Sequence, residues 1–225
     1  LKAQEKRLEN IEFTAMPEVE EEIFFAFASV DLPKKKVIVD LQIPILQIED
    51  KILGRDISLQ VHGGQHLCIL GKNGVGKSTL LKLIYNELKE RKDIVLGYMP
   101  QNYEEILDNF ETPLSFLTSG SVSSTKAREY LGNMRFTKEE MNGNMKHLSN
   151  GTKAKLFFTR FVLEKCNVLL LDEPTRNISP LSGYVLRRVL KDFKGTLISI
   201  SHDRKYIEEV IDHVYQWNEK GLKKL

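Results

Sequence analysis

Two groups of residues in the 225-residue chain have types and a spacing suited to phosphate chemistry. The first is the run GKNGVGKS at 71–78, which fits the pattern G-x-x-x-x-G-K-[ST] at every fixed position. Its glycines let consecutive backbone N–H groups point at an anion, and the helix that follows adds partial positive charge. In this pattern the lysine reaches the β- and γ-phosphates and the last hydroxyl is a Mg²⁺ ligand. The loop residues expected to bind ATP are Gly71, Asn73, Gly74, Gly76, Lys77, Ser78 and Thr79.

The second group is the run NVLLLDEPT at 167–175. An apolar stretch expected to be a buried strand delivers Asp172 and Glu173 at its carboxyl end, where ligands bind in open α/β sheets. We expect Asp172 to hold Mg²⁺ through water and Glu173 to polarise the attacking water as a general base. Alone this would be an ordinary acidic strand end. Together with the phosphate loop it predicts an ATPase that uses ATP and Mg²⁺.

The elements that must position these groups follow from hydrophobic patterning. Short apolar runs at 67–70, 168–171 and 197–200 are separated by helical segments, which is typical of parallel strands buried on both faces. Residues 37–43 alternate apolar and polar side chains, as a half-buried antiparallel strand does, and residues 57–61 read as another strand. Residues 102–147 read as a helical insertion, and 215–225 as a terminal hairpin turning near 219–221. The expected fold is therefore α/β.

The first residues have a different character. Residues 1–22 are charged, helix-favouring and then acidic, and the chain begins with Leu rather than Met. We interpret them as the end of a linker in a longer protein. A strand is expected at 23–29, so that one ATPase domain would span 23–225.

The composition predicts a soluble, globular protein, with 41% hydrophobic and 28% charged residues and a net charge of +2. No apolar run approaches the roughly 20 residues of a membrane-spanning helix, and the charged start does not resemble a secretory leader. We therefore expect a cytoplasmic protein with no direct membrane insertion. Cys68 and Cys166 each lie beside an apolar run, which favours buried thiols over a disulfide or a metal site.

From residue 23 onward the chain resembles the nucleotide-binding domain of ABC ATPases. Gln101 lies where that family has a glutamine that contacts Mg²⁺ and water, and His202 matches its switch histidine at the γ-phosphate. Residues 148–152, LSNGT, resemble the family signature, in which Ser149 and Gly151 would face the ATP of a partner domain. The resemblance implies a P-loop fold with an antiparallel β subdomain, a mainly parallel RecA-like core and a helical subdomain at about 102–165. It also implies a second ABC domain as partner.

Three segments are similar to the ABC-F subfamily, whose members carry two ATPase domains and no membrane domain. They are SHDRKYIEEV at 201–210, GTLISISHD at 195–203 and the opening KAQEKRLE at 2–9. The resemblance implies that the chain is the second ATPase domain of a ribosome-associated protein, either a translation factor or one that protects ribosomes from antibiotics. Basic residues that could touch rRNA phosphates, or be solvated surface charge, are Lys34, Lys35, Lys36, Arg187, Arg188, Lys191 and Lys194.

The sequence departs from the family at three places. Asn150 and Thr152 replace the usual glycine and Gln or Glu of the signature, and Ser179 replaces the aspartate that follows DEPT. Ile48 occupies the position where an aromatic side chain often stacks on adenine. These changes leave nucleotide binding intact and put turnover in doubt. Two alternatives therefore stay open: the ATPase subunit of a transporter, and a nucleotide-gated scaffold that does not hydrolyse ATP.

Overall fold

A computed structural model describes residues 26–27, 32–218 and 221–225. The linker expected at 1–22 lies outside the described residues, as does most of the strand expected at 23–29.

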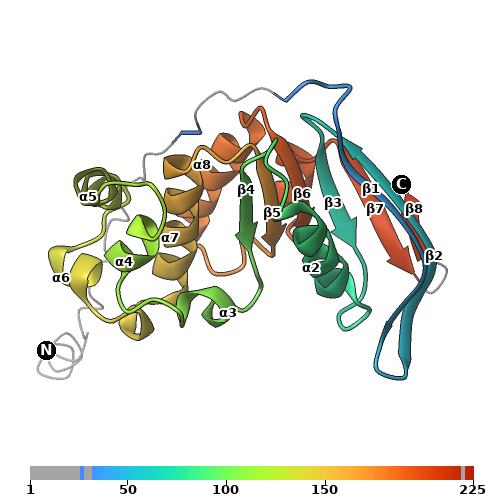
Figure 1. The fold of residues 1–225 in the computed structure, drawn as a ribbon, viewed down its shortest axis with the longest axis horizontal. Coiled ribbons are helices and arrows are strands. Elements are labelled where there is room, and N and C mark those ends of the chain that lie inside the picture. Colours follow the sequence, from blue (N-terminus) through green and yellow to red (C-terminus); the bar gives the residue numbers. More distant parts are fainter. Residues whose placement is uncertain (1–25, 28–31, 219–220) are drawn as a thin grey trace, which may run out of the picture.

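The described strands form two sheets (Figure 1). β1 (Val37–Ile48) and β2 (Lys51–His62) form an antiparallel pair with a two-residue turn. The larger sheet has the order β4-β5-β6-β3-β7-β8, and its strands are parallel except at the β7–β8 hairpin. Their bounds are β3 His66–Leu70, β4 Leu96–Met99, β5 Val168–Asp172, β6 Thr196–Ile200, β7 His213–Asn218 and β8 Gly221–Lys224.

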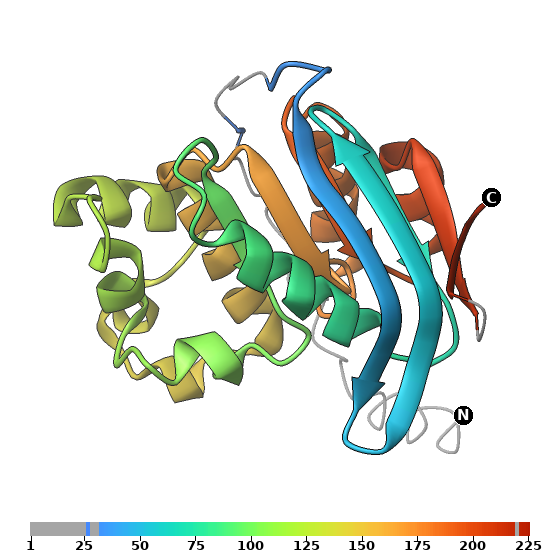
Figure 2. The same ribbon diagram turned by 45° about the vertical axis from the view of Figure 1, so that its right-hand side comes forward.

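The helices divide into those that cover the sheet and those that form a separate region. α2 (Lys77–Leu88) covers one face of the sheet beside β1 and β2 (Figure 2). α8 (Pro180–Lys191) and α9 (Arg204–Val210) pack against the other face. The helical region lies at one end of the molecule in Figure 1 and has the bounds α3 Glu104–Leu107, α4 Pro113–Thr118, α5 Ser124–Asn133, α6 Lys138–Asn142, η1 Met145–His147 and α7 Asn150–Leu163.

Alternate residues of β5 belong to two different hydrophobic cores. Val168 and Leu170 pack with α2 and the β1–β2 pair, whereas Leu169 and Leu171 pack with α7 and α8. All four are fully buried. A strand covered on both faces needs an apolar residue at every position, which explains why the sequence shows a continuous apolar run there.

The parallel strands, the helical insertion and the terminal hairpin agree with the sequence predictions. The sequence did not predict β4, which is four residues long and contains Gly97. A Cβ atom at Gly97 would lie 2.7 Å from Leu169 and 2.8 Å from Phe161, so glycine is what lets this edge strand pack closely. The arms of the β1–β2 hairpin are also longer than the predicted strands at 37–43 and 57–61.

Candidate functional site

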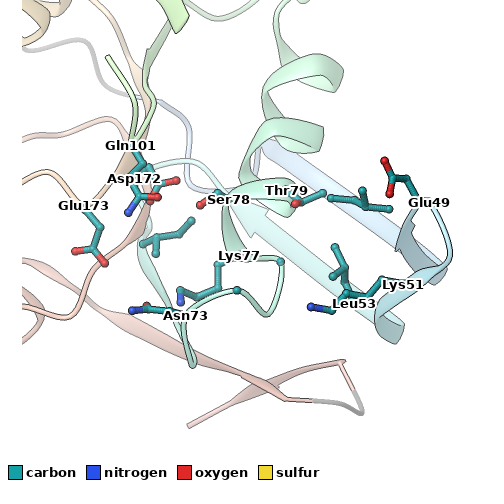
Figure 3. A pocket seen from close by; sticks show the side chains of 14 residues that line it. Glu49, Lys51, Leu53, Asn73, Lys77, Ser78, Thr79, Gln101, Asp172 and Glu173 are labelled. Carbon is teal, nitrogen blue, oxygen red and sulfur yellow. The ribbon is translucent and has the colours of Figure 1, made fainter. Parts of the chain in front are cut away.

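The phosphate loop and the acidic pair line the same cavity, which has a volume of about 450 Å³ (Figure 3). It lies at the carboxyl ends of β3 and β5, the edge of a parallel sheet where ligands bind. The remaining wall comes from the tip of the β1–β2 hairpin. The residues lining it are Ile48, Glu49, Lys51, Leu53, Asn73, Gly74, Gly76, Lys77, Ser78, Thr79, Gln101, Asp172, Glu173 and Ile200.

The loop between β3 and α2 has the backbone shape that an anion cradle requires. Gly74 has a φ of 74° and Gly76 a φ of 106°, a left-handed conformation that other residues rarely adopt. The ammonium of Lys77 donates to the carbonyl oxygens of Gly71 at 2.7 Å and Lys72 at 2.9 Å. Burial lowers the pKa of Lys77, and the charges of Glu173 and Asp172 oppose that effect.

Asp172 ends β5 and is buried beside the loop. Burial raises the pKa of its carboxyl group, and a hydrogen bond with Ser78 acts in the opposite direction. Figure 3 shows Ser78, Asp172 and Gln101 together at one end of the cavity. A hydroxyl, a carboxylate and an amide are hard oxygen donors of the kind that Mg²⁺ prefers, so the side chains present fit a magnesium–nucleotide complex.

Glu173 lines the cavity, and His202, which is not among the lining residues, lies next to Glu173. The Nε2 atom of His202 lies 3.8 Å from Oε1 of Glu173, and the backbone N–H of His202 donates to Oε2 at 3.4 Å. Glu173 has a φ of 54°, an uncommon conformation for glutamate, and its own N–H donates to the carbonyl of Ile200 at 2.8 Å. The bond to β6 therefore fixes the backbone of Glu173 while its side chain stays at the cavity.

The sequence missed the part of the cavity wall formed by Glu49, Lys51 and Leu53, because it placed no strand between 44 and 56. The Nε1 atom of Trp217 in β7 donates to the carbonyl of Leu53 at 3.1 Å and so ties the hairpin to the large sheet. The signal that could have found it is the Glu49–Asp50 turn between two segments rich in isoleucine. Ile48 does line the cavity, as expected, and is 48% exposed.

Gly71 does not line the cavity; it contributes the carbonyl that Lys77 binds. The signature residues Ser149 and Gly151 do not line it either and lie instead at the start of α7. Ser149 caps that helix by accepting from the N–H of Thr152 at 3.1 Å, and the two hydroxyls bond at 2.8 Å. The exposed start of α7 thus belongs to a surface outside this chain's own cavity.

The departure at Ser179 preserves the local structure. Ser179 is the N-cap of α8, accepting from the N–H of Ser182 at 3.3 Å, and Pro180 takes the first helical position. Serine and aspartate are both strong N-cap residues, so the helix start tolerates the replacement. What is lost is the carboxylate charge.

Cys68 and Cys166 are buried free thiols, as expected, and burial raises the pKa of Cys68 to about 11.

Among the basic residues considered for phosphate contacts at the surface, the prediction for Arg187 is wrong. Arg187 is buried, with Nε 3.0 Å from Oε2 of Glu209. Lys36 is paired with Asp93 at 2.9 Å.

A curled phosphate loop follows the central parallel strand β3, and the acidic pair ends β5, which is separated from β3 by β6. Together with the helical region, these features define a P-loop nucleotide-binding domain of the ATP-binding cassette type. A family model described as ABC transporter matches residues 54–176, more than half of the chain. The chain belongs to this family and is an ABC ATPase domain of the ABC-F kind.

The ABC-F assignment comes from curated relatives. The chain is 30% identical over 231 residues to "ABC transporter F family member 2" of Arabidopsis thaliana, covering 97% of this chain and 34% of that protein. It is 33% identical over 227 residues to "Probable ATP-binding protein YheS" of Escherichia coli (strain K12), covering 93% and 34%. It is 27% identical over 219 residues to "Protein GCN20" of Saccharomyces cerevisiae, covering 93% and 29%. The chain spans about a third of the length of these relatives.

Solved structures share the fold. The dimeric ATP-binding cassette MJ0796 in a post-hydrolysis state with ADP and Pi aligns with a TM-score of 0.67 at 18% identity, covering 82% of this chain and 97% of that one.

Within residues 26–27, 32–218 and 221–225, every helix is too short or too polar to cross a bilayer.

Proposed function

We propose that the chain binds Mg²⁺–ATP in the cavity of Figure 3 and that Glu173 is the general base of its hydrolysis. The observation that carries this proposal is the placement of Glu173 and His202 within 3.8 Å of one another in the structure that also holds Lys77 in a phosphate loop. The carboxylate of Glu173, whose backbone is bonded to β6, can accept a proton from a water molecule in line with the γ-phosphate.

The other residues have roles that follow from their chemistry. Lys77 exchanges its two loop carbonyls for phosphate oxygens, and the loop N–H groups surround the β-phosphate. Ser78, Asp172 and Gln101 would hold the Mg²⁺, which would neutralise phosphate charge when bound. His202 orients Glu173 and contacts the γ-phosphate, and the aliphatic side chain of Ile48 contacts the adenine.

Replacement of Glu173 by Gln tests this role. The amide keeps the shape of the side chain and cannot take a proton, so phosphate release should fall about 100-fold or more. ATP affinity should stay within about twofold, because the phosphate-loop contacts do not involve this residue. The matched control is Glu129→Gln on the exposed surface of α5, which should hydrolyse ATP at the wild-type rate. Equal rates for all three proteins near background would instead support the nucleotide-gated scaffold.

We further propose that the domain works with a second ABC domain, and that Ser149 and Gly151 of this chain complete the ATP-binding site of that second domain. Three observations support this: the two residues lie outside the chain's own cavity, they are at a helix N-terminus suited to phosphate, and the cassette MJ0796 is described as dimeric. ATP would hold the two domains closed, and loss of the γ-phosphate contacts would let them open.

The ABC-F relatives and the resemblance of the chain to the second domain of such proteins support a cytoplasmic ribosome-binding role. The test is co-sedimentation of the full-length protein with ribosomes, with Glu173 and its counterpart in the other domain both replaced by Gln. We expect pelleting with ATP and none with ADP, because only the closed state persists when hydrolysis is blocked. Pelleting with both nucleotides, or with neither, would count against this role if ATP binding is intact. Pelleting with neither nucleotide would favour a membrane partner. Protection from antibiotics, which is a narrower form of the same role, would be tested after a positive result.

A further inference from the structure

His66, the first residue of β3, is a buried histidine whose two ring nitrogens both face carbonyl oxygens. It is 5% exposed. Its Nδ1 atom lies 3.0 Å from the carbonyl oxygen of Val210, and its Nε2 atom lies 3.1 Å from that of Phe193. A carbonyl oxygen only accepts hydrogen bonds, and a neutral imidazole carries a proton on one nitrogen alone. Both bonds can therefore form together only when the ring is protonated on both nitrogens.

The two carbonyl groups belong to the ends of two helices. Val210 is the last residue of α9, and Phe193 follows the last residue of α8 by two positions. The last carbonyls of a helix have no partner within it and carry partial negative charge, which favours a cation beside them. The imidazole ring also stacks on the ring of Phe193, with centroids 6.1 Å apart and planes 24° apart. A doubly protonated His66 would therefore satisfy both oxygens and place positive charge where the helix ends favour it.

The charged side chains around His66 are nearly balanced. His66 borders a cavity of about 790 Å³, and three basic and three acidic side chains also line it: Lys34, Lys191, Lys194, Glu208, Glu209 and Asp212. Because these charges offset one another, the two carbonyl oxygens are the feature that selects the cation. Because His66 lines the cavity, its proton can exchange with solvent.

The nearest of these groups have partners of their own. Glu209 is paired with Arg187 at 3.0 Å, and a carboxylate oxygen of Asp212 accepts the backbone N–H of His66 at 3.3 Å. The neighbouring strand β7 begins with His213, whose Nε2 lies 3.3 Å from Nε2 of Gln65. An amide nitrogen only donates, so that nitrogen of His213 must be unprotonated. His66 and His213 thus face opposite requirements.

From this geometry we propose that His66 is held as a cation and acts as a pH-sensitive tie between the start of β3 and the ends of α8 and α9. Histidine is the side chain that changes charge between about pH 5 and 8. When His66 loses one proton, a ring nitrogen becomes an acceptor facing a carbonyl oxygen, and one of the two bonds is lost. Because the folded state binds this proton, its contribution to stability is present at low pH and is lost as pH rises.

The tie connects two elements that meet at the nucleotide cavity. α9 begins two residues after His202, and β3 ends directly before Gly71 of the phosphate loop. Loss of the tie should therefore loosen α9 first, at its carboxyl end. The inference goes beyond the proposed function, because it needs no nucleotide in the cavity.

The experiment is amide hydrogen exchange on the full-length protein without nucleotide at about pH 6 and about pH 9, on either side of the range in which histidine titrates. Each rate is corrected for intrinsic chemical exchange at that pH, and the readout is the protection of residues 204–213. In the wild type the protection should fall about tenfold from the lower to the higher pH, because a buried carbonyl loses its donor.

Two variants of His66 separate its charge from its presence. His66→Arg keeps a permanent charge and several donors, and the adjoining cavity gives room to the longer side chain, so protection should be equal at the two pH values. His66→Gln is neutral throughout and should show the lower protection at both. The matched control is His147→Gln on the exposed surface of η1, which should behave as the wild type.

The protonation state is read directly from the ¹⁵N chemical shifts of histidine-labelled wild-type protein. The His66 signals are identified by their loss in either variant. At about pH 7, just above the ordinary pKa of an exposed histidine, both ring nitrogens of His66 should carry protons.

Three results would overturn the inference. They are a wild-type protection at 204–213 that does not change with pH, an equal change in His66→Arg, and a His66 ring with one unprotonated nitrogen at about pH 7. Each of them would leave the proposed ATP site untouched, since no nucleotide is present.

Discussion

At the scale of single residues, the acidic pair shows how burial prepares a site for its ligand. Asp172 lies in the core at the end of β5, where its charged form is disfavoured, whereas Glu173 is held beside His202 at the cavity. A cation beside Asp172 removes the penalty that burial imposes on the carboxylate. Binding of Mg²⁺–ATP is therefore favoured by the attraction between the cation and the buried carboxylate of Asp172.

The mutation Asp172→Asn should stabilise the nucleotide-free protein and weaken Mg²⁺-dependent ATP binding. Because the pKa of Asp172 is raised in the folded state, its carboxyl binds protons more readily when folded, and its contribution to stability is lost as pH rises through that region. At pH 7 we therefore expect a higher free energy of unfolding for Asp172→Asn than for the wild type, seen as a higher unfolding midpoint.

The stability gain should disappear near pH 3, below the ordinary pKa of aspartate at about 4, where the wild-type carboxyl is neutral in both states. Thermal unfolding of both proteins across this pH range measures it, with the exposed Asp108→Asn as control. A loss of stability at pH 7 would contradict this account of Asp172.

At the scale of elements, the phosphate loop depends on the hairpin that packs against it. Gly76 precedes α2 with a φ of 106°, and a Cβ atom there would lie 2.9 Å from the side chain of Leu53. Leu53 is in turn fixed by its bond to Trp217. The β1–β2 hairpin thus supports the loop from outside the parallel sheet as well as forming one wall of the cavity.

Gly76→Ala should therefore damage both stability and ATP binding. Backbone strain at a left-handed position, added to the contact with Leu53, should cost about 1–3 kcal/mol in the free energy of unfolding. The control is Gly132→Ala in α5, where φ is not positive and nothing lies within 4 Å of the added atom. That change should stabilise by about 0.5–1 kcal/mol. Chemical denaturation compares the two, and equal effects would show that strain at Gly76 is not important.

At the scale of the whole molecule, the chain's own cavity contains the phosphate loop and the acidic pair but not the signature. If that signature serves a second domain, an isolated chain can complete its site only by pairing with another copy. Its hydrolysis should then be weak and depend on concentration.

This dependence can be measured directly from phosphate release by the isolated chain. The rate per molecule should rise as the protein concentration rises, approaching a tenfold increase for each tenfold step while pairing is weak, by mass action. Ser149→Ala should lower the rate at every concentration, whereas Ser182→Ala in α8 should not. Rapid turnover that is independent of concentration would contradict the partner-site proposal.

The sequence by itself predicted the phosphate-binding residues and the main sheet except for its edge strand β4. A phosphate loop is a local pattern, because its glycines and lysine act within eight consecutive residues, and a strand buried on both faces is visible as an apolar run. The positions of Lys77, Ser78, Asp172 and Glu173 at one cavity follow once parallel strands are assumed, because their carboxyl ends share an edge.

Only the tertiary structure decided how segments distant in the chain meet. The short edge strand β4 is held by packing of Gly97 against β5 and α7, and the hairpin tip reaches the cavity because Trp217 binds Leu53 across 164 positions. The pairing of Lys153 with Glu104 likewise has no signature in sequence spacing, since each residue alone resembles ordinary surface charge. Contacts of this kind depend on which faces are buried against each other, and that is set by the packing of the whole domain rather than by any local pattern.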